Sequence, residues 1–305
     1  MVGSNDMRAA VIGGSGLIGR AVAKALADRG VETIVVSRRR PPGKGAWHAA
    51  DVTDRDGLLD LLQSLRPDVV VHLAAFLQHA TERDPQQAVR VNVDGTVNVL
   101  ECCRALRVKR LVYGSSIAVY GERTDLMRED DPLSPNVSLY GMMKRLCEML
   151  GERYADQHGL AFVALRYSGV FGPGGAGSSG MALVRKRIME TADGTDVQVE
   201  GASGEERAHL THVSDAANAT CLAALHPGPV SGIYNVCGPP ENYMSLREFH
   251  AVVRQLSPQA GRVQWSGNSR SAGPVDATRL RNDLGYVPAI SVSAGLAMDL
   301  RERRD

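Results

Sequence analysis

The stretch VIGGSGLIGRAV near the amino terminus constrains the fold of this chain more than any other feature. It places Gly13, Gly16 and Gly19 three residues apart, between the apolar run RAAVIGG and the helically periodic segment LIGRAVAKALADRG. Glycine permits a tight turn and close approach to a pyrophosphate, while a helix N-terminus offers N–H groups and partial positive charge. The sequence therefore predicts a strand–turn–helix unit that binds a dinucleotide, rather than a glycine-rich turn that serves packing alone.

Strand and helix patterns alternate from the start of the chain to about residue 170. Several strand segments, among them VETIVVSR, DVVVHLAA and VKRLVYGSS, are continuously apolar or nearly so, which is typical of a parallel sheet covered on both faces. Beyond the glycine-rich stretch GPGGAGSSG the elements become shorter. We expect an α/β protein: a Rossmann-type doubly wound parallel sheet over residues 1–170, and a smaller, mainly substrate-binding lobe over 171–305. Some elements near 207–237 are expected to return to the core sheet.

The bulk composition argues against several classes of protein. With 305 residues and a formal net charge of +1, the chain has no general attraction to nucleic acid or an anionic membrane. No apolar run reaches membrane-spanning length, and the N-terminus lacks the basic start and apolar core of a signal peptide, so a cytoplasmic location is expected. The cysteines number five without any C-x-x-C, so we expect neither a disulfide framework nor a metal site.

The second predicted strand bears on the choice of cofactor. It ends in VVSRRRPP, where folds that bind NAD usually carry Asp or Glu for the ribose hydroxyls. Ser37 and Arg38 stand there instead, and a hydroxyl and a guanidinium suit a 2′-phosphate. We therefore expect NADP to be preferred; the alternative is NAD, with the arginines forming only a solvated basic turn.

Further motifs follow in order, and together they resemble the extended short-chain dehydrogenase/reductase family, the NAD-dependent epimerase/dehydratase group. DVTD (51–54) looks like the family's adenine-side motif, VVHLAA (70–75) like its fourth strand, NVDGTVNVLE (92–101) like the helix with a structural asparagine, and LVYGSSIAVYG (111–121) like the strand with the catalytic serine. YGMMK supplies a Y-x-x-x-K. The resemblance implies cofactor contacts from Gly13, Gly16, Leu17, Ile18, Gly19, Ser37, Arg38, Asp51, Val52, Leu73, Ala74, Ala75, Asn92, Tyr140, Lys144 and Tyr167.

Tyr140 and Lys144 are four residues apart and share one face of a predicted helix over 138–158. Alone, the pair is typical of a helix surface. Beside a dinucleotide loop it favours acid–base chemistry, because a nearby ammonium stabilises phenolate and lowers the tyrosine pKa. Either Ser115 or Ser116 offers a hydroxyl at a strand end. The resemblance points to Ser116, and so to a catalytic set of Ser116, Tyr140 and Lys144.

The stretch SSIAVYG narrows the reaction. Dehydratases of the family carry an Asp-Glu pair just after the catalytic serine or threonine, whereas Ile117 and Ala118 cannot transfer protons. The motifs favour an epimerase that removes a hydride transiently from a carbinol carbon of a sugar, with a nucleotide sugar as the expected substrate. An NADPH-dependent reductase or dehydrogenase of a non-nucleotide carbonyl or alcohol stays open, while the intact catalytic set argues against a non-catalytic regulator.

Besides Ser116, which the resemblance implies binds the reacting oxygen, three residues are candidates for substrate binding. Arg207 matches a family arginine that pairs with the diphosphate of a nucleotide sugar, although a structural salt bridge is the alternative; Arg270 is a second candidate. His79, in the predicted loop after HLAAFLQ, is the third. Gly169 departs from the family pattern, since nucleotide-sugar enzymes usually have an asparagine there that donates to the diphosphate. A natural-product ketone or a simple sugar is therefore the alternative substrate.

The resemblance also implies a homodimer, in which the predicted helices at 85–107 and 138–158 of each copy form a four-helix bundle. A small-molecule substrate is the other partner expected. His72 lies on a predicted buried strand and is interpreted as a hydrogen-bonded core residue. His209 and His212 flank a strand without a third ligand nearby in sequence, so no metal is expected there.

Overall fold

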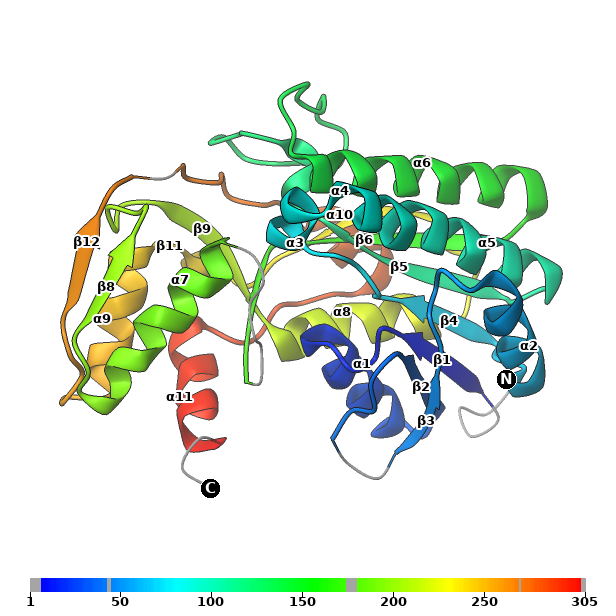
Figure 1. The fold of residues 1–305 in the computed structure, drawn as a ribbon, viewed down its shortest axis with the longest axis horizontal. Coiled ribbons are helices and arrows are strands. Elements are labelled where there is room, and N and C mark those ends of the chain that lie inside the picture. Colours follow the sequence, from blue (N-terminus) through cyan, green and yellow to red (C-terminus); the bar gives the residue numbers. More distant parts are fainter. Residues whose placement is uncertain (1–6, 43–44, 174–179, 269, 303–305) are drawn as a thin grey trace.

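The computed structural model of the protein describes residues 7–42, 45–173, 180–268 and 270–302. Residues 1–6, on which part of the signal-peptide argument depends, and residues 174–179 of the glycine-rich stretch lie outside the described residues. The main body is a seven-stranded parallel sheet in the order β10-β6-β5-β4-β1-β2-β3 (Figure 1). Its strands are β1 (Arg8–Ile12), β2 (Glu32–Ser37), β3 (Ala46–Ala49), β4 (Val69–His72), β5 (Arg110–Ser116), β6 (Ala161–Tyr167) and β10 (Gly232–Val236).

Each face of this sheet packs against helices, because successive side chains of a strand point to opposite sides. In β1, Ala9 and Val11 belong to one core, whereas Ala10 and Ile12 belong to the other. Helices α1 (Leu17–Ala27), α8 (Val213–Leu225) and α10 (Thr278–Leu284) contribute to the first core, and α2 (Arg55–Leu65), α5 (Gly95–Ala105) and α6 (Leu139–His158) to the second. The arrangement confirms the predicted doubly wound Rossmann-type sheet.

Two segments of the main body differ from expectation. Strand β3 was not predicted, because its four residues are largely exposed and form no apolar run. The helix expected at 85–107 is α4 (Pro85–Val89), a π-helical turn η2 (Arg90–Asp94) and α5. Asn92 lies in that π-turn, buried, where its amide accepts from the Phe76 N–H (2.7 Å) and donates to the Phe76 carbonyl (3.0 Å). The asparagine thus fixes the chain just after β4, as a structural residue would.

A smaller lobe extends from one end of the sheet, at the left of Figure 1. A three-stranded sheet, β11-β9-β7, and a two-stranded pair, β12-β8, surround a core of their own with helices α7, α9 and α11. The bounds of these elements are β7 (Gly169–Phe171), α7 (Gly180–Met189), β8 (Val197–Glu200), β9 (Arg207–His212), β11 (Tyr243–Ser245), α9 (Leu246–Leu256), β12 (Val263–Ser266) and α11 (Val292–Glu302). Ser245 and Glu248 form the predicted capping box at the start of α9.

The chain crosses between the two bodies more than once. Strand β9, which follows β7 and β8, belongs to the three-stranded sheet of the smaller lobe. The chain then returns to the main body, where α8 packs against α1 and β10 joins the edge of the main sheet. Short helical elements complete the chain: α3 (Gln78–Arg83), η3 (Ile117–Tyr120), η4 (Glu190–Asp193) and η5 (Pro240–Asn242). Within the described ranges, no helix has the length and apolarity needed to cross a membrane.

Candidate active site

The glycine loop lies where the strand order of the main sheet reverses, between β1 and β4. Open parallel sheets bind ligands at the carboxyl ends of their strands at such a point. Gly13 has φ +82°, and a Cβ added there would lie 2.4 Å from the Ala74 backbone nitrogen. A Cβ on Gly19 would lie 2.4 Å from the Gly13 carbonyl oxygen. Both glycines are therefore required by backbone packing, which brings the loop against the end of β4.

Gly16 has a different role, at the N-cap of α1. Among the described residues no side chain caps this helix, and a Cβ on Gly16 would meet no atom nearer than 3.4 Å. The N–H groups of the first turn, which includes Leu17 and Ile18, therefore face a space that a pyrophosphate can occupy, where the helix dipole favours an anion. These residues fit the dinucleotide predicted from the sequence. Leu73, Ala74 and Ala75, which follow β4, line the same edge of the sheet.

The end of β2 carries the residues expected near the adenosine. Ser37 is buried: its hydroxyl donates to the Arg39 carbonyl (2.8 Å) and accepts from the Trp47 indole N–H (3.1 Å). Arg38 is exposed and lies 4.0 Å from the Asp51 carboxylate, which also accepts from the Thr53 N–H. The Ser37 hydroxyl is thus engaged inside the protein, and Arg38 is the predicted phosphate ligand that a cofactor can reach.

Val52 and Tyr167 are placed differently from the other predicted cofactor residues. Val52 packs in the core, where a Cβ on Gly95 of α5 would lie 2.6 Å from its side chain. The Tyr167 ring is also buried, and its hydroxyl bonds to Thr220 of α8 (2.7 Å). The Tyr167 side chain therefore holds the end of β6 against α8. Because this side chain is engaged in the core, only the backbone of Tyr167 could make the predicted cofactor contact.

Ser116, Tyr140 and Lys144 come together from β5 and α6. Ser116 ends β5, and Ser138 caps α6 by accepting from the Gly141 N–H (3.2 Å). A Cβ on Gly141 would lie 2.3 Å from the Ala118 carbonyl oxygen in η3, the turn that follows Ser116. The glycine after the tyrosine therefore lets α6 approach this turn. That approach brings Tyr140 next to Ser116, whose hydroxyl interacts with the phenol.

Burial sets the electrostatics of this set. Lys144 donates to the Gly114 carbonyl (2.6 Å), and its Nζ lies 4.6 Å from the Tyr113 ring centroid and 5.7 Å from that of Tyr140. Burial lowers the pKa of Lys144 to about 8 and raises the pKa of Tyr140 to about 12, the latter partly offset by Ser116. At neutral pH the lysine is still charged and the phenol is protonated; an oxidised nicotinamide bound nearby would add positive charge that favours the phenolate.

A buried ion pair, which the sequence reasoning missed, holds these elements in register. Glu148, one turn beyond Lys144, accepts from the Ser115 hydroxyl (2.6 Å) and from Arg166 Nε (2.9 Å) and Nη2 (2.8 Å). Arg166 Nη1 donates to Tyr120 (2.8 Å), the last residue of η3. The pair links α6 to both sides of Ser116. Its only sequence signal was an acidic residue four positions after the lysine on the same helix face.

The predicted substrate residues are scattered. Arg207 forms an ion pair with Glu248 (3.1 Å), donates to the Tyr243 carbonyl (2.8 Å) and stacks on the Tyr243 ring. Arg270 is exposed and pairs with Glu122. His79 was expected in a loop, which is wrong: it lies on α3, with an exposed side chain. Arg207 therefore has the salt bridge that was its alternative interpretation, and the site does not bring the three residues into contact.

Comparisons with known proteins show the family of the chain. The model of the NAD dependent epimerase/dehydratase family matches residues 9–237. The chain belongs to this family. It is 29% identical to UDP-glucose 4-epimerase of Azospirillum brasilense, over 92% of this chain and 87% of that protein. It is 30% identical to a 3-diazoavenalumate denitrifying reductase of a Streptomyces species, over 71% of this chain and 72% of that protein.

Solved structures agree. UDP-glucose 4-epimerase of Thermus thermophilus in complex with NAD is 26% identical, with a TM-score of 0.87 over 98% of this chain and 99% of that one. These matches confirm the predicted resemblance to the extended short-chain dehydrogenase/reductase family. They identify the chain as an enzyme of this epimerase and oxidoreductase group, and they support a nicotinamide cofactor.

His72 lies in the core within the electrostatic influence of Lys144. It is fully buried, its Nε2 lies 3.2 Å from the Thr96 hydroxyl, and burial followed by the charge of Lys144 lowers its pKa to about 3. It is therefore a neutral, hydrogen-bonded core histidine, as interpreted from the sequence. His209 is also buried and contacts the Gly238 carbonyl (3.0 Å). No group of potential ligands that could hold a metal is found in the described part of the chain.

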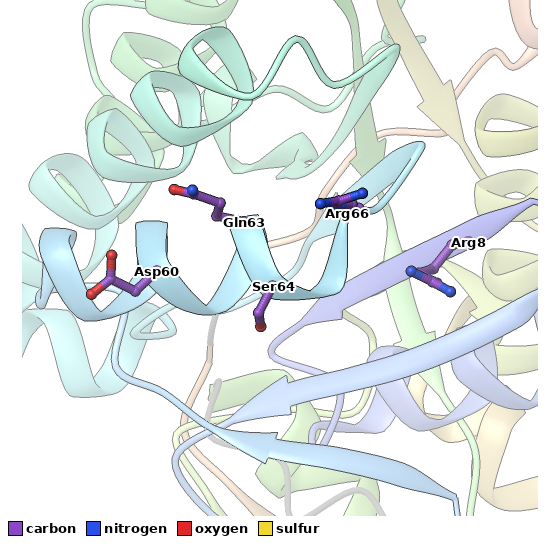
Figure 2. Close-up of a pocket in the computed structure, with 5 residues that line it drawn as sticks. All are labelled: Arg8, Asp60, Gln63, Ser64 and Arg66. Carbon is purple, nitrogen blue, oxygen red and sulfur yellow. The ribbon is translucent and has the colours of Figure 1, made fainter.

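A surface hollow lies away from this site. Figure 2 shows its lining at the amino end of β1 and along α2: Arg8, Asp60, Gln63, Ser64 and Arg66. Strand β1 starts at Arg8 and the glycine loop follows Ile12, so the hollow is at the edge of the sheet opposite the glycine loop and Ser116. Arg8 donates to the Leu65 carbonyl (2.6 Å) and pairs with Glu32 (3.0 Å). The contacts of Arg8 are therefore those of a structural residue.

Proposed function

We propose that the protein is an epimerase of a nucleotide sugar that inverts a carbinol carbon through a transient ketone. The observation that carries the proposal is the set of Ser116, Tyr140 and Lys144 beside a dinucleotide cradle, with the apolar residues Ile117 and Ala118 after the serine. These residues can move one proton at an alcohol but cannot eliminate water. Relatives named as UDP-glucose, UDP-glucuronate and ADP-heptose epimerases support this reaction and this substrate class.

In this proposal each residue acts on the reacting hydroxyl. Tyr140 as phenolate removes its proton, Lys144 stabilises the phenolate by its charge, and Ser116 donates a hydrogen bond that orients the oxygen. The loop of Gly13, Gly16 and Gly19 would hold a nicotinamide dinucleotide, which would supply reversible hydride transfer at the same carbon. Inversion would follow when the ketone presents its other face. Tyr140 then returns the proton, so the reaction consumes no net cofactor.

A reductase or dehydrogenase of a non-nucleotide carbonyl or alcohol compound is the second candidate. It needs only one half of the same chemistry, and the relative named 3-diazoavenalumate denitrifying reductase supports it. Gly169, where nucleotide-sugar enzymes of the family usually have asparagine, favours it as well. The two candidates differ in one measurable respect, because a reductase consumes cofactor in proportion to product.

For the cofactor, we propose that NADP is preferred over NAD. Strand β2 ends without a carboxylate that could accept from both ribose hydroxyls, and the exposed Arg38 guanidinium follows it. Asp51, 4.0 Å away, neutralises part of that charge, so the preference is expected to be moderate. The Ser37 hydroxyl contributes by holding the turn through Arg39 and Trp47.

We further propose that two copies of the chain form a homodimer through α6 together with α4 and α5. Met142, Leu146 and Met149 of α6 have exposed fractions of 48%, 43% and 59%. Their spacing of four and three residues places them on one face of the helix. An apolar stripe of this kind on a surface helix is typical of a helix-to-helix interface, and the second copy is the partner expected from the family.

The function is tested by incubating the purified enzyme with UDP- and ADP-sugars. Sugar products are separated by chromatography while absorbance at 340 nm follows reduced cofactor. An epimerase gives a new sugar without net absorbance change; stoichiometric consumption of NADPH with a carbonyl compound would favour the reductase. Tyr140→Phe should lose turnover by at least a thousandfold and still bind cofactor. A variant with near-normal activity would contradict the proposed role of Tyr140.

A further inference from the structure

Arg185 of α7 is a buried cation that the sequence reasoning did not single out. Its side chain is 6% exposed, and Nη2 donates to the Val170 carbonyl in β7 (3.1 Å). Burial alone lowers its pKa, to about 10. The guanidinium thus lies in the smaller lobe against the short strand that directly follows the end of β6.

The other buried arginines and the two arginines predicted to bind substrate all have partners within the protein, either a carboxylate or a set of backbone carbonyls. Arg166 pairs with Glu148, Arg207 with Glu248 and Arg270 with Glu122. Arg110 is buried without a carboxylate, but it donates to four carbonyls at the end of α8: Ala223, Ala224, His226 and Gly228.

Arg185 differs from all of these. No acidic side chain among the described residues forms an ion pair with it, and residues 174–179, which precede α7, contain no acid. Burying an unpaired charge is costly, so such a group is a candidate for binding an anion.

Gly169 determines what lies beside this guanidinium. A Cβ on Gly169 would be 3.4 Å from Arg185 Nη1, 3.1 Å from Leu210 Cδ2 and 3.2 Å from the His209 carbonyl oxygen. A larger side chain at position 169 would therefore crowd Nη1. Gly169 lies two residues beyond Tyr167, which pairs in register with Ser116. The guanidinium consequently lies at the same carboxyl edge of the sheet as the catalytic serine.

We propose that Arg185 binds an anionic group of the substrate, a phosphate of the diphosphate that joins nucleoside to sugar, next to Gly169. The planar guanidinium offers paired N–H donors that match phosphate oxygens. The bound phosphate supplies the negative charge that the protein itself does not place beside Arg185. This inference rests on the proposed nucleotide-sugar function, because it names the residue that would recognise that class of substrate.

The test compares Arg185→Met with the wild type by titrating UDP and ADP in the presence of NADP, and uridine and adenosine as phosphate-free probes. Whichever diphosphate the wild type binds should lose at least tenfold in affinity in the variant, whereas the nucleoside should change less than twofold. The melting temperature should stay the same or rise, because the variant removes an unpaired buried charge. Arg187→Met removes an exposed charge from the same helix and serves as the matched control.

The outcomes separate the two proposals. Diphosphate binding by the wild type that is unchanged within twofold in Arg185→Met overturns the role of Arg185 and leaves the proposed function standing. Absence of diphosphate binding by the wild type counts against the nucleotide-sugar function itself. If Arg185→Met does not fold, Arg185→Lys decides, because it keeps the charge but loses the paired N–H donors of the guanidinium. A severalfold loss of diphosphate affinity in that variant supports the inference, and unchanged affinity overturns it.

Discussion

Replacing Lys144 with methionine should abolish turnover and change how the stability of the enzyme depends on pH. Burial lowers the pKa of Lys144 from the ordinary 10.5 to about 8, which corresponds to about 3 kcal/mol of destabilisation below pH 8. In the folded state the lysine loses its proton first, so this cost decreases as pH rises from about 8 towards 10.5. Between pH 7 and pH 9.5 roughly 2 kcal/mol of it should disappear.

Methionine does not titrate, so its variant lacks this cost at both pH values. The variant also loses the hydrogen bond to Gly114 and the contact with the Tyr113 ring. These losses are similar at pH 7 and at pH 9.5, so they enter the comparison as a constant. Urea unfolding of cofactor-free protein gives the free energy of unfolding of each protein at each pH. The free energy of the variant minus that of the wild type should fall by about 2 kcal/mol from pH 7 to pH 9.5.

A difference that does not change with pH would refute the reasoning, because it would mean that burial does not perturb the lysine. Lys24→Met removes an exposed lysine from α1 and controls for the change of net charge. The experiment also measures what the site costs the fold. A lysine that destabilises the protein at the pH where it works is retained for its charge beside Tyr140, not for its packing.

Three further changes test other parts of the structure. Arg38→Ser should weaken NADP at least tenfold and NAD less than threefold in fluorescence titrations of the reduced cofactors; equal losses would contradict a contact with the 2′-phosphate. Leu146→Glu should convert a dimer to a monomer in sedimentation velocity, while Lys24→Glu on α1 should not; a Leu146→Glu dimer would argue against the α6 interface. Gly141→Ala should lower kcat more than tenfold with cofactor binding kept, because its Cβ would lie 2.3 Å from the Ala118 carbonyl and push α6 from Ser116. Normal kcat in that variant would show that close approach is not required.

Patterns along the sequence predicted the Rossmann sheet, the glycine loop and the helix that carries Tyr140 and Lys144. Each of these depends on neighbouring residues: a run of apolar side chains makes a buried strand, and a spacing of four makes a shared helix face. The same reasoning missed β3, whose side chains are largely exposed, and placed His79 in a loop rather than on α3. Both are short segments in which local pattern is weak.

Which partner each charged side chain meets was decided by the tertiary structure alone. The sequence proposed Arg207 and Arg270 as substrate ligands, yet the fold gives them Glu248 and Glu122 as partners, and it leaves Arg185 without one among the described residues. Periodicity can indicate which face of an element is buried. It cannot indicate the partner, because Coulomb interactions depend on the distance between side chains that the fold brings together from remote parts of the chain.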